Sequence, residues 1–133
     1  MIGALSILYV DDEPDIRLIV EMSLAMQPKF TVRTAESGEA ALQILHGERW
    51  RPNLVMVDVM MPGLTGPDVL AVLRADAETE SLPVIFVTAR ARQEDIEAYI
   101  AQGAMGVITK PFDPLTLTDQ IGALLQAKTG RSS

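Results

Sequence analysis

The feature that most constrains the fold is a set of four short apolar runs and one stretch of alternating character, residues 30–35, which are separated by amphipathic stretches. Most of the runs are rich in β-branched residues and stop at acidic residues, glycine or proline, and they occupy residues 7–10, 30–35, 54–57, 84–87 and 105–108. Short apolar runs bounded by such turn signals are typical of strands in a parallel sheet whose two faces are both covered. The sequence therefore predicts five buried strands.

The stretches between these runs carry apolar residues at helical spacing and have recognisable end signals. Thr65-Gly66-Pro67-Asp68 resembles a capping box, and Gly103 is placed as a C-terminal cap. The five predicted helices occupy residues 14–27, residues 37–47, a segment that begins at the capping box, residues 94–102, and a segment that begins at Asp113-Pro114.

Strictly alternating strands and helices predict an α/β fold, a doubly wound parallel sheet with right-handed crossovers. We expect five strands in the flavodoxin-like order 2-1-3-4-5. A chain of 133 residues suits one domain. We therefore interpret residues 1–133 as a single domain with a packed core over about residues 5–126 and a flexible tail at 127–133.

Composition narrows the classes of function. The net charge is −7 with no basic cluster, which disfavours direct binding of nucleic acid. The absence of cysteine removes disulfides, thiolate metal sites and cysteine nucleophiles. No apolar stretch approaches the roughly 20 residues of a membrane span, and the N-terminus lacks the pattern of a signal peptide. We expect a cytoplasmic protein that does not associate with membranes.

The polar residues of interest fall where predicted strands end. Asp11 and Asp12 follow the first strand, Asp58 ends the third, Thr88 ends the fourth, and Lys110 follows the fifth. The carboxyl ends of parallel strands share one edge of the sheet, and ligands bind there at the point where the strand order reverses. The order 2-1-3-4-5 makes the first and third strands neighbours, so these five side chains should converge.

Three converging carboxylates repel one another, and a single lysine does not neutralise them. An all-oxygen set of ligands suits Mg²⁺, whereas the lone His46 lies on a predicted helix and cannot build a zinc site. A lysine and a hydroxyl facing that ion suit an anion, most plausibly phosphate. A carboxylate can also act as a nucleophile and form an acyl phosphate. The alternative for Asp58 is a structural ion pair with Lys110.

Four pieces of sequence together resemble a known family. They are V-D-D-E-P at 10–14, D-V-M-M-P-G-L-T-G at 58–66, V-T-A at 87–89 and K-P-F at 110–112. In this order and at this spacing they resemble the CheY-like receiver domain of bacterial two-component response regulators. The resemblance spans about residues 5 to 126.

The resemblance implies that Asp58 is the phosphoacceptor, phosphorylated by a sensor histidine kinase, a phosphotransfer protein or a small phosphodonor. It implies that Asp12, Asp58 and the backbone carbonyl of Met60 ligate Mg²⁺ directly, while Asp11 acts mainly through water. It gives the protein no catalytic activity beyond its own phosphorylation and dephosphorylation.

The resemblance also assigns the residues that respond to phosphorylation. Lys110 would pair with the phosphoryl oxygens, the Lys110-Pro111 bond would be cis, and Thr88 would hydrogen-bond the phosphoryl group. Receivers usually carry an aromatic residue three positions before the lysine, where this chain has Val107. Met60 and Arg90 are candidate modulators of the lifetime of the phosphoryl group, although Arg90 could equally be a solvated loop residue.

The sequence leaves two alternative functions to consider. Haloacid-dehalogenase-type phosphatases also use an aspartate at a strand end, but they need a second aspartate two residues later, where this chain has Met60. A receiver-like interaction module that works without phosphorylation is a further alternative, and Val107 keeps it open. We expect a monomer or weak dimer that controls an unidentified downstream protein, either alone or as part of a longer regulator or kinase.

Overall fold

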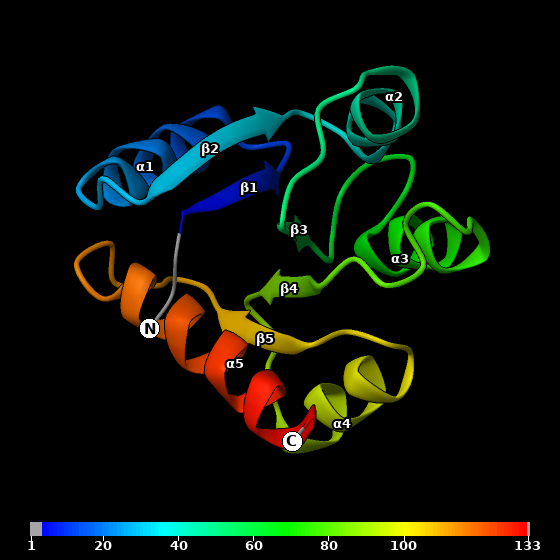
Figure 1. The fold of residues 1–133 in the computed structure, drawn as a ribbon. Coiled ribbons are helices and arrows are strands. Elements are labelled where there is room, and N and C mark those ends of the chain that lie inside the picture. The colour runs from blue at the N-terminus through cyan, green and yellow to red at the C-terminus, as the bar shows by residue number, and fades with distance from the viewer. Residues whose placement is uncertain (1–3, 133) are drawn as a thin grey trace.

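Strands and helices alternate along the whole of the described chain (Figure 1). The computed structural model describes residues 4–132, and the side chains of residues 4–127. Within this range the elements are β1 Leu5–Val10, α1 Pro14–Ala25, β2 Phe30–Ala35, α2 Gly38–Gly47, β3 Leu54–Asp58, α3 Gly66–Ala75, β4 Val84–Thr88, α4 Gln93–Ala101, β5 Gly106–Thr109 and α5 Leu117–Ser132. All five predicted strands and all five predicted helices are present.

The strands form one parallel sheet in the order β2-β1-β3-β4-β5, which is the expected flavodoxin-like order. The order reverses between β1 and β3, which are hydrogen-bonded neighbours. In the register Asp58 lies beside Val87, and Thr88 lies beside Thr109. The register therefore brings the carboxyl ends of β3, β4 and β5 to one edge of the sheet.

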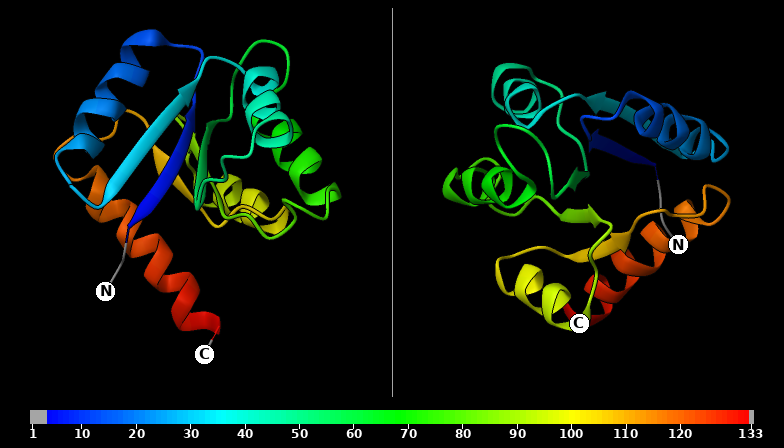
Figure 2. Two further views of the ribbon diagram at one scale, coloured as in Figure 1. Left: turned by 45° about the horizontal axis from the view of Figure 1, so that its top comes forward. Right: turned by 180° about the vertical axis from the view of Figure 1, so that it is seen from behind.

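Helices cover both faces of the sheet (Figure 2). One core cluster lies between the sheet and α2, α3 and α4, and the other lies between the sheet and α1 and α5. Side chains alternate along β1, so Leu8 and Val10 join the first cluster, while Ile7 and Tyr9 join the second. This two-sided burial explains why β1, β3 and β4 read as mostly continuous apolar runs. The edge strand β2 alternates in sequence, and most of its residues are only half-buried.

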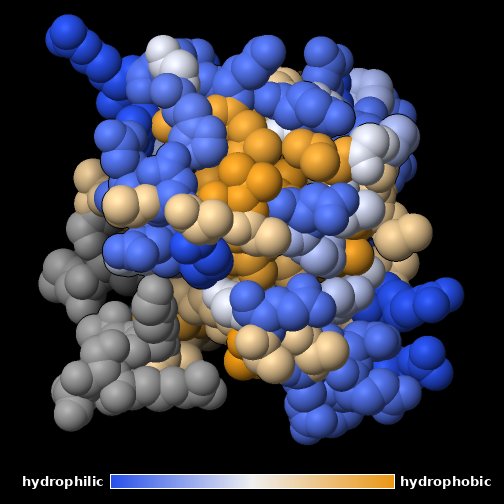
Figure 3. Space-filling model, turned by 90° about the vertical axis from the view of Figure 1, so that its right-hand side faces the viewer, coloured by the Kyte–Doolittle hydropathy of each residue, from blue (hydrophilic) through white to orange (hydrophobic). Residues whose placement is uncertain are grey.

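The helices that cover the first core cluster, α2, α3 and α4, also form part of the molecular surface (Figure 3). On this side apolar surface gathers in the middle, and polar side chains surround it. Most of the large apolar side chains beneath belong to the core cluster, although Val72 of α3 remains 37% exposed.

The start of α3 is fixed tightly against β3. The predicted capping box is confirmed, because Thr65 Oγ1 accepts a hydrogen bond from the Asp68 amide and Asp68 Oδ2 accepts one from the Thr65 amide. Gly66 follows, and a Cβ atom at this position would lie 2.9 Å from the backbone oxygen of Asp58. Only glycine allows the two backbones to approach this closely.

The last helix begins later than predicted. Asp113-Pro114 does not open α5, which starts at Leu117. Instead Asp113 closes a turn, since its Oδ1 accepts a hydrogen bond from the Leu115 amide and its carbonyl accepts one from the Thr116 amide. A proline also disfavours a helical backbone at the residue before it.

The chain terminus differs as well. The helical backbone of α5 continues to Ser132, beyond the core that was expected to end near residue 126. The flexibility of residues 127–133 stays a prediction, and residues 1–3 and 133 lie outside the described residues. None of the described helices is both long and apolar enough to cross a membrane.

Candidate functional site

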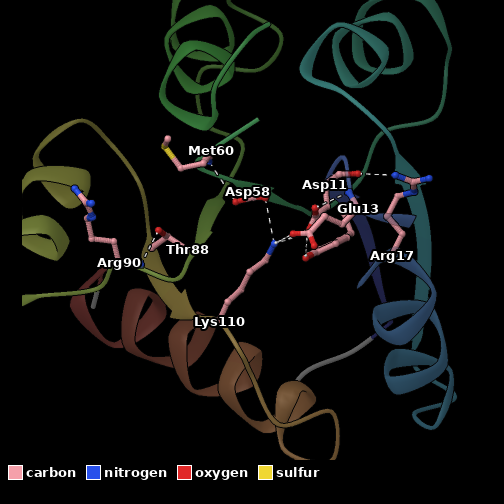
Figure 4. A network of polar contacts seen from close by, with 9 residues as sticks. Asp11, Glu13, Arg17, Asp58, Met60, Thr88, Arg90 and Lys110 are labelled. Carbon is pink, nitrogen blue, oxygen red and sulfur yellow. Dashed lines mark hydrogen bonds and ion pairs between the residues drawn. The ribbon is translucent and has the colours of Figure 1, made fainter. Parts of the chain in front are cut away.

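The predicted site residues meet at the carboxyl edge of the sheet (Figure 4). Asp58 is the last residue of β3 and Thr88 is the last residue of β4, while Asp11 and Lys110 directly follow β1 and β5. Asp11, Asp58 and Thr88 are buried, with exposures of 0%, 5% and 3%. Asp58 and Lys110, which lie 47 and 99 positions after Asp11 in the sequence, therefore meet Asp11 in one site, as the strand order predicted.

Lys110 is the cation at the centre of the site. Its Nζ atom lies 2.8 Å from Asp11 Oδ2, 3.1 Å from Asp58 Oδ2 and 3.4 Å from Glu13 Oε1. These partners account for all three protons of the ammonium group. The Lys110–Pro111 peptide bond is cis, as the resemblance implied. The ion pair with Asp58 therefore exists, and it also places a cation beside the expected phosphoacceptor.

The remaining contacts of Asp58 and Asp11 come from backbone and buried groups. The Met60 amide donates to Asp58 Oδ1 at 3.2 Å, and the Glu13 amide donates to Asp11 Oδ1 at 3.0 Å. The Tyr9 hydroxyl donates to Asp11 Oδ2 at 2.8 Å. Sequence reasoning missed both Tyr9 and Glu13 as site residues. The available signal was the pairing of Tyr9 and Asp11 two residues apart, which puts both on one side of a strand.

Asp12 completes an acidic cluster. It is exposed, and one carboxylate oxygen from each of Asp11, Asp12 and Asp58 can be chosen so that all lie within 4.8 Å of one another. Lys110 is the only described cationic side chain that forms an ion pair within this cluster, and it pairs with Asp11 and Asp58. The site therefore keeps an excess of negative charge, and its donors are all oxygens. Such a donor set fits a hard divalent cation.

The charges in the site shift the proton affinities of its groups. Burial raises the pKa of Asp58 above its ordinary value, and the hydrogen bond and charge of Lys110 offset this only in part. Burial by itself lowers the pKa of Lys110, but the combined contacts with Asp11 and Asp58 outweigh it and leave that pKa raised. Lys110 therefore stays charged, and Asp58 is a carboxylate that would gain from a further cation.

Thr88 and the two candidate modulators line the outer part of the site. Thr88 Oγ1 accepts a hydrogen bond from the Arg90 amide at 3.0 Å. Arg90 is exposed, and its guanidinium group points away from Asp58 (Figure 4). The side chain of Met60 is 75% exposed, and Met60 and Arg90 both line a cavity of about 440 Å³ beside Asp58.

That cavity contains one aromatic side chain that sequence reasoning did not assign to the site. Tyr99 of α4 lines it together with Asp58, Thr88 and Lys110. Val107 lines a different hollow of about 500 Å³ between α4, β5 and α5. Tyr99 and Val107 are both half-buried and pack against the same core cluster. The available signal in the sequence was the absence of an aromatic residue at Val107 together with the presence of one on the preceding helix, at Tyr99.

Comparison with known proteins places this geometry in a family. The model of the response regulator receiver domain matches residues 7–122. The chain belongs to the response regulator receiver family. Like a receiver, it has an acidic cluster, a threonine and a lysine at the carboxyl edge of a five-stranded parallel sheet.

Relatives of this receiver include longer regulators and a protein chain of about its own length. It is 38% identical to the phosphate regulon transcriptional regulatory protein PhoB of Klebsiella pneumoniae, over 90% of this chain and 51% of PhoB. It is 38% identical to the response regulator Rre1 of Synechocystis, over 95% of this chain and 52% of Rre1. The structure of the chemotaxis protein CheY4 of Vibrio cholerae superimposes with a TM-score of 0.81 and 29% identity, over 92% of this chain and 99% of CheY4.

The receiver spans about half the length of PhoB and Rre1, and 45% and 51% of the regulators from Guillardia theta and Streptomyces coelicolor. The functions of the unmatched parts of these relatives are therefore not assigned to this receiver. The comparisons favour a receiver over the alternative of an interaction module that works without phosphorylation. Met60 at the second position after Asp58 argues against a dehalogenase-type phosphatase.

Proposed function

We propose that this receiver accepts a phosphoryl group on Asp58 and that the change controls a downstream protein. The observation that carries the proposal is the position of the Asp58 carboxylate, which is buried at the end of β3 with Lys110 Nζ 3.1 Å away. Phosphoryl transfer depends on positioning and charge neutralisation, and the site supplies both.

The reaction exchanges one phosphorus bond for another. A carboxylate oxygen of Asp58 attacks the phosphorus atom of a phosphohistidine on a sensor histidine kinase or a phosphotransfer protein. The phosphorus–nitrogen bond breaks, and the histidine leaves as the neutral ring after taking up a proton. With acetyl phosphate as donor, acetate leaves instead. The product in both cases is an acyl phosphate on Asp58.

The acidic cluster would hold Mg²⁺, with Asp12, Asp58 and the Met60 carbonyl as direct ligands and Asp11 acting through water. A bound magnesium ion would neutralise the charge that develops on the phosphoryl oxygens. The residues of the chain supply the rest. The Met60 amide and Lys110 orient Asp58, and Lys110 can turn its protons to the phosphoryl oxygens. Thr88 would exchange its contact with the Arg90 amide for one with the phosphoryl group.

The remaining features of the proposal concern the protein in the cell. It works in the cytoplasm, turns over no external substrate, and catalyses only the gain and loss of its own phosphoryl group. Its partners are a phosphodonor protein and a downstream effector that recognises the phosphorylated form, and it acts as a monomer or weak dimer.

Intact-mass spectrometry with acetyl phosphate and Mg²⁺ tests the proposal. The wild-type protein should gain one phosphoryl group, and Asp58→Asn should gain none. Asp119→Asn is the matched control, since Asp119 is an exposed aspartate on α5. It should be phosphorylated like the wild type. Equal incorporation in Asp58→Asn and wild type would refute the assignment of the phosphoacceptor.

A further inference from the structure

Tyr9 carries a hydroxyl group although its side chain is buried in an apolar core. It lies on β1 with 0% exposure, and its ring belongs to the core cluster between the sheet and α1 and α5. A phenylalanine would fill the same volume without a hydroxyl group to desolvate. Burying a hydroxyl is unfavourable unless it is hydrogen-bonded. Here the hydroxyl reaches the Asp11 carboxylate, 2.8 Å away at the carboxyl edge of the sheet.

Asp11 is held by three donors, and they differ in how firmly each is placed. Its Oδ1 atom accepts from the Glu13 amide, and its Oδ2 atom accepts from the Tyr9 hydroxyl and the Lys110 ammonium. Two donors fill the two lone pairs of Oδ2. Arg17 additionally donates to the Asp11 backbone oxygen at 2.8 Å, which fixes the main chain. The Tyr9 ring is locked by packing, whereas Lys110 ends a flexible four-carbon side chain.

Lys110 is the donor that Asp11 can lose when Asp58 is phosphorylated. Its three protons are already distributed over Asp11, Asp58 and Glu13. A phosphoryl group on Asp58 brings further anionic oxygens, and Lys110 can reach them only by giving up a present partner. When that partner is Asp11, the Tyr9 hydroxyl is the donor that remains on Oδ2.

We propose that Tyr9 is a positioning residue of the phosphorylation site, whose hydroxyl holds the Asp11 carboxylate in the orientation that supports divalent-cation binding, both before and after Lys110 turns to the phosphoryl group. This inference rests on the proposed function.

The test is a calorimetric titration of the unphosphorylated protein with Mg²⁺, without any phosphodonor. Tyr9→Phe keeps the ring and removes only the hydroxyl. Loss of an outer-shell group typically costs 10–100-fold in metal affinity. Because Asp11 acts through water, we take the low end of this range and expect Mg²⁺ to bind about tenfold more weakly. Thr79→Val is the matched control, because Thr79 is 1% exposed and donates its hydroxyl to the Leu73 carbonyl at 2.7 Å, far from the site. Its affinity should equal that of the wild type.

Phosphorylation by acetyl phosphate at increasing Mg²⁺ gives a second measurement. Tyr9→Phe should need about tenfold more Mg²⁺ for the half-maximal rate, in line with its weaker binding, and should reach the wild-type rate at saturation. Unchanged or tighter Mg²⁺ binding by Tyr9→Phe overturns the inference, and so does an equal weakening in Thr79→Val.

These outcomes are separate from the fate of the proposed function. If wild-type Asp58 is phosphorylated and Tyr9→Phe binds Mg²⁺ like the wild type, only the role of Tyr9 falls. If the wild-type protein neither binds Mg²⁺ nor gains a phosphoryl group, the proposed function fails and the role of Tyr9 falls with it.

Discussion

The ring of Tyr99 on α4 stands edge-on against Phe86 of β4, with 5.1 Å between the ring centroids and 87° between the ring planes. Aromatic pairs favour this geometry, which adds to the burial of their surface. Tyr99 lines the cavity of Asp58, whereas Val107 does not. An aromatic ring is therefore present at the site, but it comes from α4 instead of β5.

This arrangement predicts where phosphorylation changes the structure. Addition of beryllofluoride, a phosphoryl mimic, should alter amide exchange mainly over residues 88–99, and less at Val107. In Tyr99→Ala, beryllofluoride should no longer change the amide exchange of α4. It should also cost about 2 kcal/mol of stability, roughly half the usual cost of deleting a buried ring, because Tyr99 is half-buried. Equal or larger exchange changes at Val107 would contradict this expectation.

Asp58→Asn should stabilise the protein at neutral pH when divalent cations are absent. Burial raises the pKa of Asp58, so the folded protein holds this proton more tightly than the unfolded chain does. The stabilisation from the protonated form is complete below the pKa of the unfolded chain, and it is lost as the pH rises through the pKa of the folded protein. Urea unfolding in a chelator should therefore show a stability advantage for the variant near pH 7 that shrinks toward pH 3.

Lys110→Met should destabilise the protein, because it leaves Asp11 and Asp58 without their cation. Removing one partner of a buried ion pair typically costs 3–5 kcal/mol, and we expect about 3 kcal/mol in a chelator. Mg²⁺ should stabilise this variant more than the wild type, since the ion no longer competes with the ammonium. Lys29→Met is the control, because Lys29 is exposed and lies outside the site. An equal gain from Mg²⁺ in Lys110→Met and the wild type would show that Lys110 and the ion do not compete.

Gly66→Ala should disturb both α3 and Asp58. The added Cβ would lie 2.9 Å from the Asp58 backbone oxygen and 3.0 Å from the Val59 Cα, and neither atom can move without shifting the backbone. We expect a loss of about 1–3 kcal/mol, as for other overpacked sites, together with slower phosphorylation. Gly47→Ala is the matched control, since a Cβ there meets nothing within 4 Å. Unfolding and phosphorylation rates that are unchanged in Gly66→Ala would count against close packing at this point.

Met60→Ala and Arg90→Ala should each shorten the lifetime of the aspartyl phosphate. Both residues line the cavity beside Asp58, so removal of their side chains should ease the approach of the attacking water. Met22→Ala is the control, because Met22 is also an exposed methionine, with 64% exposure, but lies on α1. Hydrolysis rates that match the wild type in both cavity variants would remove Met60 and Arg90 as modulators.

The sequence by itself determined the element order and the parallel sheet. With the flavodoxin-like strand order it also placed Asp11, Asp58, Thr88 and Lys110 at one edge of that sheet. Hydrophobic periodicity reports which faces are buried, and the parallel topology then leaves few choices for where strand ends lie. Capping signals were equally local, so the box at Thr65–Asp68 was predictable. The start of α5 was not, because the Asp113 turn competes locally with the helix.

Only the tertiary structure decided which side chains complete the site. The hydroxyl of Tyr9 reaches Asp11, Glu13 shares Lys110, and Tyr99 enters the cavity from a helix. Each contact depends on the distance and angle between elements that packing sets, and no residue pattern encodes those quantities directly. In the sequence Tyr9 is one more apolar strand residue, and in the fold it becomes a hydrogen-bond donor to the acidic cluster.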